Sequence, residues 1–412
     1  MNILYNLAIS LYGIVIRIVS LFNEKADLWI KGRKGLFDKI SREVSPGDKP
    51  IWFHAASLGE FEQGRPIIEE LRRAFPGKKI LLTFYSPSGY EVRKDCEIVD
   101  WVYYLPLDTK YNSDKFVELV NPEMAIFIKY EFWPNIINAL NTAGVNTIVV
   151  SAIFREDQVF FKSYGGWMRK SLLKFSKIFV QDDNSLSLLN SIGVDKVEKS
   201  GDTRFDRVMD ILKNDNSLDF VEKFKADNSL LVAGSTWPDD DKILVEYINT
   251  AKSNTKVIIA PHNISGSYNE KLLNKISKKA VLYSEMSDNN LEDFDVFILD
   301  TVGILTKVYS YADIAYVGGG FGKEGVHNVL EPAVFSVPVV TGPIFHQFRE
   351  AVELSNIGGM ITIDNYSEFA ATMTDFENGK ISNVGKTASK YIEDNSGAQK
   401  VILDYITENI MF

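Results

Sequence analysis

The loop after an early strand places a carboxylate where a substrate could meet it. In the stretch "FHAASLGEFEQGRP", residues 53–66, the pattern predicts a buried strand, a loop of small residues and then a helix. Glu60 directly follows the glycine of this loop. A glutamate at such a position can act as a general base for a hydroxyl nucleophile. It can equally be an acidic residue near a helix start, where the helix dipole favours it.

Two further strand-to-helix turns in the first half share this design. In "IKYEFWPN", residues 128–135, Glu131 follows an apolar strand and precedes a helix that is entered through Trp-Pro. In "TFYSPSGYE", residues 83–91, Ser86 and Ser88 occupy the turn. These side chains could line a sugar site. The alternative is that Glu131 complements a helix dipole and the serines cap a helix.

A glycine-rich loop dominates the second half. "IAYVGGGFGKEGVHNVLEPA", residues 314–333, predicts a buried strand, the loop and then a helix, and Gly320, Gly322 and Gly325 match the pattern G-x-G-x-x-G. A dinucleotide site also needs an acidic residue at the end of the next strand. That strand ends in "VVTGP", which has none. The sequence therefore argues against a nicotinamide or flavin, and we expect no cofactor.

The residues after this loop suit a nucleotide. Asn328 and Glu331 lie one helical turn apart in "HNVLEPA" and would share one face. A carboxylate there can accept both hydroxyls of a ribose, and the free N–H groups of a helix start can hold a phosphate. A capping pair explains the same two residues equally well.

Three other loops contribute candidate ligand-binding residues. Ser235 and Thr236 in "GSTWPDDD" lie between a strand and a helix, which suits a phosphate or a simple N-cap. His262 in "APHN" lies at a strand end, where a histidine is either structural or functional. Arg204 in "GDTRFDRV" could bind a phosphate or a sugar carboxylate with both of its terminal nitrogens, or could pair with Asp202 or Asp206.

Charge and cysteine content exclude several classes of protein. The 412 residues include 45 Lys and Arg against 55 Asp and Glu, a net charge of -10, which argues against a nucleic-acid partner. Cys96 is the single cysteine, so no internal disulfide is possible. The four histidines and this cysteine lack the spacing of metal ligands, and we expect no metal site.

The N-terminal segment has the composition of a membrane anchor. Residues 1–22, "MNILYNLAISLYGIVIRIVSLF", are mostly apolar, and the following "KADLWIKGRKGLFDKISR" is basic. Basic residues beside an apolar helix favour the cytoplasmic side of a membrane and anionic headgroups. We expect an uncleaved helix that spans the membrane or lies in its interface. The alternative is a first helix that packs within the fold.

The rest of the chain alternates short apolar runs with amphipathic helical patterns, which is typical of βαβ units and predicts two doubly wound α/β domains. The polar segment 208–229 marks the boundary between them. The expected strands of the first domain are 51–54, 80–84, 124–128, 147–151 and 177–181. Those of the second are 230–235, 256–261, 296–300, 314–319 and 337–342.

Taken together, the motifs resemble one family along nearly the whole chain. In order they are "ASLGE", "TFYSPSGYE", "YEFWPN", "GDTRFD", "STWPDDD", "LDTVGIL", "YVGGGFGKEGVHNVLEPA" and "VPVVTGP". This set is similar to that of the lipid A 3-deoxy-D-manno-octulosonic acid (Kdo) transferases, glycosyltransferase family 30. The resemblance implies a GT-B fold, with two Rossmann-like domains facing a central cleft, at the cytoplasmic face of the inner membrane. It also implies metal-independent, inverting transfer of Kdo from CMP-Kdo to a lipid A precursor.

The resemblance assigns domains and residues. It implies a membrane anchor at 1–22, an acceptor-binding domain at 23–210, a CMP-sugar-binding domain at 225–385 and a C-terminal helical segment packing across domains at 386–412. Glu60 falls on the catalytic base. The acceptor and sugar site would hold Ser57, Gly59, Ser86 and Glu131. The donor site would hold Arg204, Ser235, Thr236, His262, Gly303, Gly319, Gly320, Asn328 and Glu331.

Two departures from the family pattern and two rival functions remain. The basic linker "KGRKGLFDKISREV" matches the family only loosely. Many members have an arginine in "P-R-H-P", where this chain has "APHN"; either His262 takes its place or Arg204 supplies the contact. A GT-B transferase with another nucleotide sugar, such as a UDP donor, is the nearest alternative enzyme. A non-catalytic, membrane-attached nucleotide-binding module is the alternative without chemistry.

Overall fold

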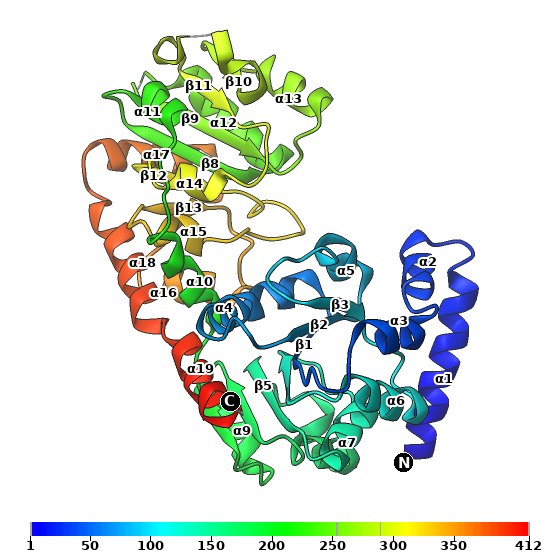
Figure 1. Ribbon diagram of the computed structural model, residues 1–412. Coiled ribbons are helices and arrows are strands. Elements are labelled where there is room, and N and C mark those ends of the chain that lie inside the picture. Colours follow the sequence, from blue (N-terminus) through cyan, green and yellow to red (C-terminus); the bar gives the residue numbers. More distant parts are fainter. Residues whose placement is uncertain (1, 253, 289, 411–412) are drawn as a thin grey trace. The chain divides into compact units, whose positions relative to one another are not determined.

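The computed structural model describes residues 2–252, 254–288 and 290–410, which form two compact units. Unit 1 contains residues 1–207 and 396–412, and unit 2 contains residues 208–395. Each unit has one parallel sheet with helices between successive strands (Figure 1). The predicted pair of doubly wound α/β domains is therefore confirmed.

The sheet of unit 1 has seven strands in the order β3-β2-β1-β4-β5-β6-β7. Its strands are β1 (Ile51–Ala55), β2 (Ile80–Phe84), β3 (Trp101–Tyr104), β4 (Met124–Ile128), β5 (Asn146–Ala152), β6 (Lys177–Val180) and β7 (Val197–Lys199). Its helices are α1 (Asn2–Val19), α2 (Glu24–Lys31), α3 (Leu36–Glu43), α4 (Leu58–Ala74), α5 (Pro87–Arg93), α6 (Lys110–Val120), α7 (Pro134–Thr142), α8 (Gly166–Leu172), α9 (Asp183–Ser191) and α19 (Ala398–Asn409), with short 3-10 turns η1 (Val159–Phe161) and η2 (Ser163–Gly165).

The sheet of unit 2 also has seven parallel strands, in the order β10-β11-β9-β8-β12-β13-β14. Its strands are β8 (Leu230–Thr236), β9 (Lys256–Pro261), β10 (Ala280–Leu282), β11 (Val296–Ile298), β12 (Ile314–Val317), β13 (Val339–Thr341) and β14 (Ile361–Thr362). Helix α10 (Thr203–Ile211) leads into this unit. The others are α11 (Asp219–Lys225), α12 (Pro238–Thr250), α13 (Gly266–Leu273), α14 (Leu305–Tyr309), α15 (Leu330–Ala333), α16 (Arg349–Asn356), α17 (Tyr366–Glu377) and α18 (Ser382–Asn395), with 3-10 turns η3 (Tyr283–Asp288) and η4 (Leu291–Asp293).

All ten strands expected from the apolar runs are present, and four others, β3, β7, β10 and β14, escaped prediction. The missed strands lie toward the sheet edges and have two to four residues each. Edge strands are covered less completely, so they need not be apolar throughout; β7 reads Val-Glu-Lys. Such short segments carry too little pattern to be distinguished from loops.

Alternation along the strands of unit 1 produces two cores, one on each face of the sheet. Trp52, Leu81 and Phe127 belong to one apolar cluster, whereas Phe53 and Leu82 belong to the other. Helices cover both faces, which is why these strands read as continuous apolar runs. Ile402 and Ile406 of α19 complete the second core, so the last helix of the chain is part of unit 1.

The predicted membrane anchor is wrong. Among the described residues no helix is both long and apolar enough to cross a membrane, and the localisation at the cytoplasmic face of the inner membrane through residues 1–22 is overturned with it. The polar residues that interrupt the apolar run bind the fold instead. Tyr5 donates to Asp108 Oδ2 at 2.7 Å, and Asn6 Oδ1 accepts from Asn135 Nδ2 at 3.0 Å. The other face of α1 leaves apolar side chains such as Leu11 exposed, which explains the anchor-like sequence pattern.

Candidate active site

The turn between β1 and α4 places Glu60 at the C-terminal edge of the unit 1 sheet. Helix α4 starts at Leu58, so Glu60 lies in its first turn. Its Oε2 accepts from the backbone N–H of Ala56 at 2.5 Å, which folds the side chain back over the loop. Ser57 is the N-cap residue but makes no side-chain capping bond, and Gly59 is exposed. Glu60 thus combines a cap-like contact with a position that a substrate can approach.

The neighbouring strands bring two more predicted residues to this edge. Ser86 follows β2 and caps α5 by accepting from Ser88 N at 3.3 Å, and its own N–H donates to Ala56 O at 2.8 Å. Glu131 follows β4 and is buried. Strands β2, β1 and β4 are adjacent in the sheet, so their C-terminal ends lie together. The structure therefore brings Ser57, Gly59, Glu60, Ser86 and Glu131 into one region.

Glu131 is held by a buried hydrogen-bonded network. Its Oε2 accepts from Trp133 Nε1 at 2.6 Å and lies 3.1 Å from His54 Nε2. The other ring nitrogen of His54 lies 2.8 Å from Thr83 Oγ1 and 3.1 Å from Thr83 O. Both His54 and Thr83 are fully buried. This network fixes the carboxylate of Glu131 in one orientation, as a functional group requires.

Burial and a neighbouring negative charge change the acidity of Glu60. Burial is the main factor, and together with the charge of Glu131 it raises the pKa of Glu60 to about 7. The N–H of Ala56 and the charges of His54 and Lys129 act in the opposite direction. A carboxylate with a pKa near neutrality is a stronger base than an ordinary glutamate and still ionised in a large fraction of molecules at pH 7. The site can therefore take a proton from a weakly acidic hydroxyl.

Three non-glycine residues at strand ends have left-handed backbone. Lys129, Ser151 and Ser235 have φ values of +65°, +56° and +55°, although none is glycine. Lys129 directly follows β4, Ser151 is the penultimate residue of β5, and Ser235 is the penultimate residue of β8. Left-handed backbone at non-glycine residues is costly and concentrates at functional sites. Lys129, which sequence reasoning missed, lies between β4 and Glu131 in the chain, and its charge acts on Glu60.

The raised pKa of Glu60 predicts a stabilising substitution. Between its ordinary pKa of 4.5 and about 7, the folded protein holds a proton that the unfolded chain has lost. This stabilisation is complete below pH 4.5 and is lost as the pH rises to about 7. Glu60→Gln never ionises, so we expect it to raise Tm at pH 8 by about 2–4 °C, from roughly 1 kcal/mol, and to change Tm little at pH 5.

Scanning calorimetry at the two pH values checks this expectation. Glu69→Gln makes the same chemical change on the same helix at an exposed position that pairs with Arg65, and it should show no such pH dependence. If Glu60 acted only as a cap for α4, the Glu60→Gln protein would have a lower Tm than wild type at pH 8, because a capping carboxylate stabilises a helix start.

In unit 2, a buried aspartate joins the two loops that carry candidate donor-binding residues. Asp240 of α12 accepts from Trp237 N at 2.8 Å, from Gly319 N at 2.8 Å and from Tyr316 Oη at 2.6 Å. Burial raises the pKa of Asp240, and the three donors counteract this effect. Asp240 thus fixes Trp237 and the end of β8, where Ser235 and Thr236 lie, against the glycine loop after β12.

The glycine loop needs glycine for close packing. Gly319 has φ of +91°, and a Cβ there would meet Gly325 O at 2.3 Å. A Cβ on Gly318 would lie 2.4 Å from Ser235 O, so the two loops touch through their backbones. The loop is therefore held in one conformation, with Gly319 and Gly320 buried beneath its surface.

Three aromatic rings stack at the same edge of the unit 2 sheet. The rings of Trp237 and His262 are parallel within 15°, with centroids 4.5 Å apart, and His327 lies 4.9 Å from His262. Trp237 Nε1 donates to His327 Nε2 at 2.9 Å. Burial, followed by the nearby His262, lowers the pKa of His327. His262 contacts both other rings and is exposed, so its ring can meet a ligand.

The side chains of Asn328 and Glu331 form a hydrogen-bonded pair, as their spacing in the sequence allows. Asn328 Nδ2 donates to Glu331 Oε1 at 3.0 Å, and Asn328 Oδ1 accepts from Leu330 N at 3.2 Å. The second oxygen of Glu331 accepts from Thr306 Oγ1 at 3.0 Å. Helix α15 has only four residues, so its start offers few free N–H groups for a phosphate. Gly303 is exposed, with φ of +90°, in the loop before α14.

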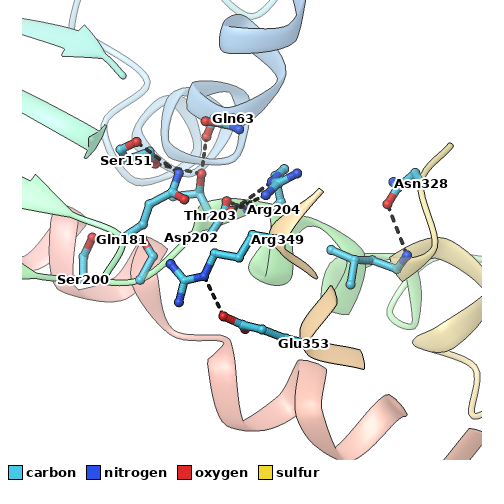
Figure 2. Close-up of polar contacts among 12 residues, drawn as sticks. Gln63, Ser151, Gln181, Ser200, Asp202, Thr203, Arg204, Asn328, Arg349 and Glu353 are labelled. Carbon is cyan, nitrogen blue, oxygen red and sulfur yellow. Dashed lines mark hydrogen bonds and ion pairs between the residues drawn. The ribbon is translucent and has the colours of Figure 1, made fainter. Parts of the chain in front are cut away.

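Arg204 is paired within unit 1. Figure 2 shows Arg204 against Asp202: Nε and Nη2 lie 2.9 Å and 2.7 Å from Asp202 Oδ2. The preceding Thr203 donates to Gln63 O at 2.7 Å and lies 3.1 Å from the hydroxyl of Ser151, which fixes the start of α10. The ion pair that was the simple alternative for Arg204 therefore exists, and it holds the guanidinium in a defined orientation.

The candidate residues fall into two groups. Those of the acceptor side and Arg204 belong to unit 1, and the remaining donor-side residues belong to unit 2. Ser235, Thr236, His262, Gly319 and Gly320 gather at the ends of the adjacent strands β9, β8 and β12. Sequence reasoning missed His54, Lys129, Trp237, Asp240 and His327. Within the described ranges, no cluster of three or more His, Cys, Asp or Glu side chains is arranged for a metal ion.

Comparison with known proteins gives a consistent result. The sequence profile of the 3-deoxy-D-manno-octulosonic-acid transferases matches residues 30–207. The 3-deoxy-D-manno-octulosonic acid transferase of Aquifex aeolicus is 30% identical over 348 residues, covering 83% of this chain and 89% of that relative. The transferase of the same name from Haemophilus influenzae is 27% identical over 389 residues, covering 89% of both.

Among solved structures, the UDP-GlcNAc 2-epimerase from Neisseria meningitidis bound to UDP-GlcNAc has a similar fold. Its TM-score is 0.58 at 14% identity, with 87% of this chain and 100% of that chain covered. A likeness at this identity concerns the arrangement of secondary structure and not the substrate. It agrees with a chain built from two Rossmann-like units.

Proposed function

This chain belongs to the family of 3-deoxy-D-manno-octulosonic acid (Kdo) transferases and is a glycosyltransferase, and from that premise we propose that it moves Kdo from CMP-Kdo to a lipid A precursor of the lipid IVA type. The observation that carries this proposal is the coupled pair Glu60 and Glu131 at one sheet edge, inside the segment that matches the family profile. Transfer to a sugar hydroxyl requires a base whose pKa is close to neutral pH.

Glu60 is assigned the role of general base. The acceptor hydroxyl gives its proton to Glu60 as its oxygen forms a bond to the anomeric carbon of Kdo, and the bond from that carbon to the CMP phosphate breaks. Attack on the face of the sugar opposite the CMP phosphate inverts the configuration at the anomeric carbon. His54 and Trp133 hold Glu131, whose charge keeps the pKa of Glu60 high.

Unit 2 is assigned the donor. Ser235 at the end of β8, the ring of His262 and the glycine loop around Gly319 offer hydroxyl, aromatic and N–H groups to CMP, whereas Thr236 is buried. Asn328 and Glu331 are assigned to the ribose. Fixed N–H groups and Arg204 would stabilise the charge that develops on the CMP phosphate, and we propose that no metal ion is needed.

Asp240 should control donor affinity without touching the donor. Asp240→Asn replaces a carboxylate that accepts from three donors by an amide that cannot accept them all, so the two loops it joins should loosen. We expect the Kd for CMP to rise about tenfold, measured by isothermal titration calorimetry.

Asp239→Asn is the matched control, because Asp239 is exposed and pairs with Lys242 on the surface of the same helix. Equal CMP affinities for wild type, Asp239→Asn and a folded Asp240→Asn variant would show that Asp240 does not shape the donor site.

Product analysis tests the function itself. Purified protein is incubated with CMP-Kdo, generated in situ, and a tetra-acylated lipid A precursor, with and without EDTA, and the lipid is analysed by mass spectrometry. We expect addition of Kdo at the same rate in both samples and an inverted anomeric configuration by NMR. Transfer from a UDP-sugar, with none from CMP-Kdo, would contradict the donor assignment; loss of transfer in EDTA would contradict metal independence.

A further inference from the structure

Unit 1 contains a cavity that is not lined by Glu60 or Glu131. It has a volume of about 800 Å³ and lies among α1, the start of α7, the turn η2 and α8. Among the described residues that line it, none is acidic, whereas Lys170 and Lys174 contribute two cations. In a chain with a net charge of -10, a cavity whose charged lining residues are both cations favours an anionic ligand.

The walls of this cavity are built by a buried polar network. Asp108 is fully buried and accepts from Tyr5 Oη at 2.7 Å, from Asn135 N at 3.1 Å and from Ile136 N at 2.9 Å. The ring of Tyr5 also contacts that of Trp167 in α8, with centroids 5.6 Å apart. These contacts fix α1, α7 and α8 together, so the cavity is part of the folded structure of unit 1.

The two lysines have no acidic partner among the described residues. Lys170 is exposed, and Lys174 is half-buried and donates to Asn138 Oδ1. Burial lowers the pKa of Lys174, because no negative charge compensates the cation. An anion that enters the cavity would supply this charge and gain charge-assisted hydrogen bonds from both ammonium groups.

The remaining lining groups suit a sugar. Tyr5, Tyr164 and Trp167 provide aromatic surface, on which the C–H face of a sugar ring can lie. Asn135 Oδ1 can accept from a sugar hydroxyl and Asn138 Nδ2 can donate to one, whereas Asn135 Nδ2 already donates to Asn6 and Asp108 and Asn138 Oδ1 accepts from Lys174. A cavity lined by cations, aromatic rings and amides suits a sugar that carries an anionic group.

The cavity is close to the candidate catalytic residues within unit 1. Pro134 lines it and lies three residues after Glu131, and three residues span at most about 11 Å. Trp133, between them, donates to Glu131. A disaccharide headgroup placed over Trp133 could therefore reach both places at once.

We propose that this cavity binds a phosphorylated sugar, namely the phosphate-bearing glucosamine of the acceptor, and orients the acceptor hydroxyl toward Glu60. This inference rests on the proposed function, which supplies a phosphorylated glucosamine lipid as acceptor. Lys170 and Lys174 hold the phosphate, and the rings of Tyr164 and Trp167 hold the sugar.

Kinetics with two acceptors test the proposal. The lipid A precursor is compared with its enzymatically dephosphorylated form, using wild type and the variant Lys170→Ala/Lys174→Ala. We expect the double substitution to raise KM for the phosphorylated acceptor about tenfold, to leave KM for the dephosphorylated acceptor unchanged, and to leave kcat and the KM for CMP-Kdo unchanged. Lys94→Ala/Lys199→Ala is the matched control, since it removes two exposed lysines that pair with neighbouring acids in unit 1. An equal loss on both acceptors, or no loss on either, would overturn the proposal.

Direct binding separates this proposal from the proposed function. Glucosamine 1-phosphate, glucosamine and Kdo are titrated into the wild type and into the double variant. Stronger binding of glucosamine 1-phosphate than of glucosamine, lost in the variant, supports the cavity assignment even if no Kdo is transferred, in which case the proposed function alone fails. Preferential binding of Kdo, or equal binding of the phosphate sugar to both proteins, would overturn the cavity assignment even if transfer is observed.

Discussion

Replacing Glu60 with glutamine is expected to lower kcat for Kdo transfer by a factor of about 10²–10⁴, the range that a general base contributes. The amide can still accept from Ala56 N, so the loop and the start of α4 should keep their structure. What it cannot do is take a proton from the acceptor hydroxyl. Initial rates at saturating CMP-Kdo and lipid A precursor, measured by mass spectrometry, give kcat for both proteins.

The size of the effect distinguishes the two interpretations of this residue. Glu69→Gln, on the same helix but exposed, should keep the wild-type rate. A folded Glu60→Gln protein that keeps kcat within about twofold of wild type would be inconsistent with a base, because the loss would then be far below what proton transfer contributes. Glu60 would then be a structural residue at a helix start.

Replacing Glu131 with glutamine should have the second largest effect. The amide removes the negative charge beside His54 and Glu60. Without that charge the ionised form of Glu60 is easier to reach, so the pKa of Glu60 should fall toward its ordinary value. We expect kcat/KM to fall by roughly 10–100-fold, because a weaker base in a less ordered site serves the reaction poorly. The pH at which activity is half lost on the acid side should also move down.

A double-mutant cycle tests the coupling between these carboxylates. If Glu131 acts through Glu60, the Glu60→Gln/Glu131→Gln protein should be no slower than Glu60→Gln alone. If the losses of activity in the two single variants are additive, and the acid side of the pH profile is unchanged in Glu131→Gln, then Glu131 affects activity by another route. Trp133→Phe, which removes one hydrogen bond to Glu131 and keeps its charge, should lower activity without moving the acid limb.

The strands and loops could be predicted from the sequence because strands that are buried on both faces of a sheet consist of uninterrupted apolar runs. Glu60, Ser86 and Glu131 were placed correctly at strand ends, since the strand-to-helix turn is itself visible as a change of pattern. What the pattern could not provide is which residues meet across strands. His54 lies on β1 and its partner Glu131 follows β4, 77 positions later, and only the sheet order brings them together.

Asp240 shows a second limit of sequence reasoning. In "WPDDD" three aspartates follow a proline, and their composition indicates acidic residues in a first helical turn. The structure distinguishes them: Asp239 pairs with Lys242 at the surface, whereas Asp240 is buried against Gly319 and Tyr316. The signal available in the sequence was a glycine-rich loop together with a run of aspartates in the same domain. Which of the three aspartates contacts that loop depends on the rotation of α12 about its own axis, which the sequence does not give.

The N-terminal segment was misread for a related reason. An apolar face on α1 looks the same in sequence whether it enters a membrane or stays exposed, and the docking contacts come from Tyr5 and Asn6, which a hydropathy pattern counts only as interruptions. Their partners, Asp108 and Asn135, are more than 100 positions away and cannot be identified from the helix alone.

The pH dependence of kcat/KM for the wild-type enzyme is the measurement that tests the central claim most directly. Because the base must be ionised and the pKa of Glu60 is about 7, kcat/KM should rise about tenfold per pH unit below pH 7 and become level above it. An enzyme that transfers Kdo at a rate independent of pH between about 5 and 8 would contradict the account, because no half-buried carboxylate of raised pKa could then be taking the proton.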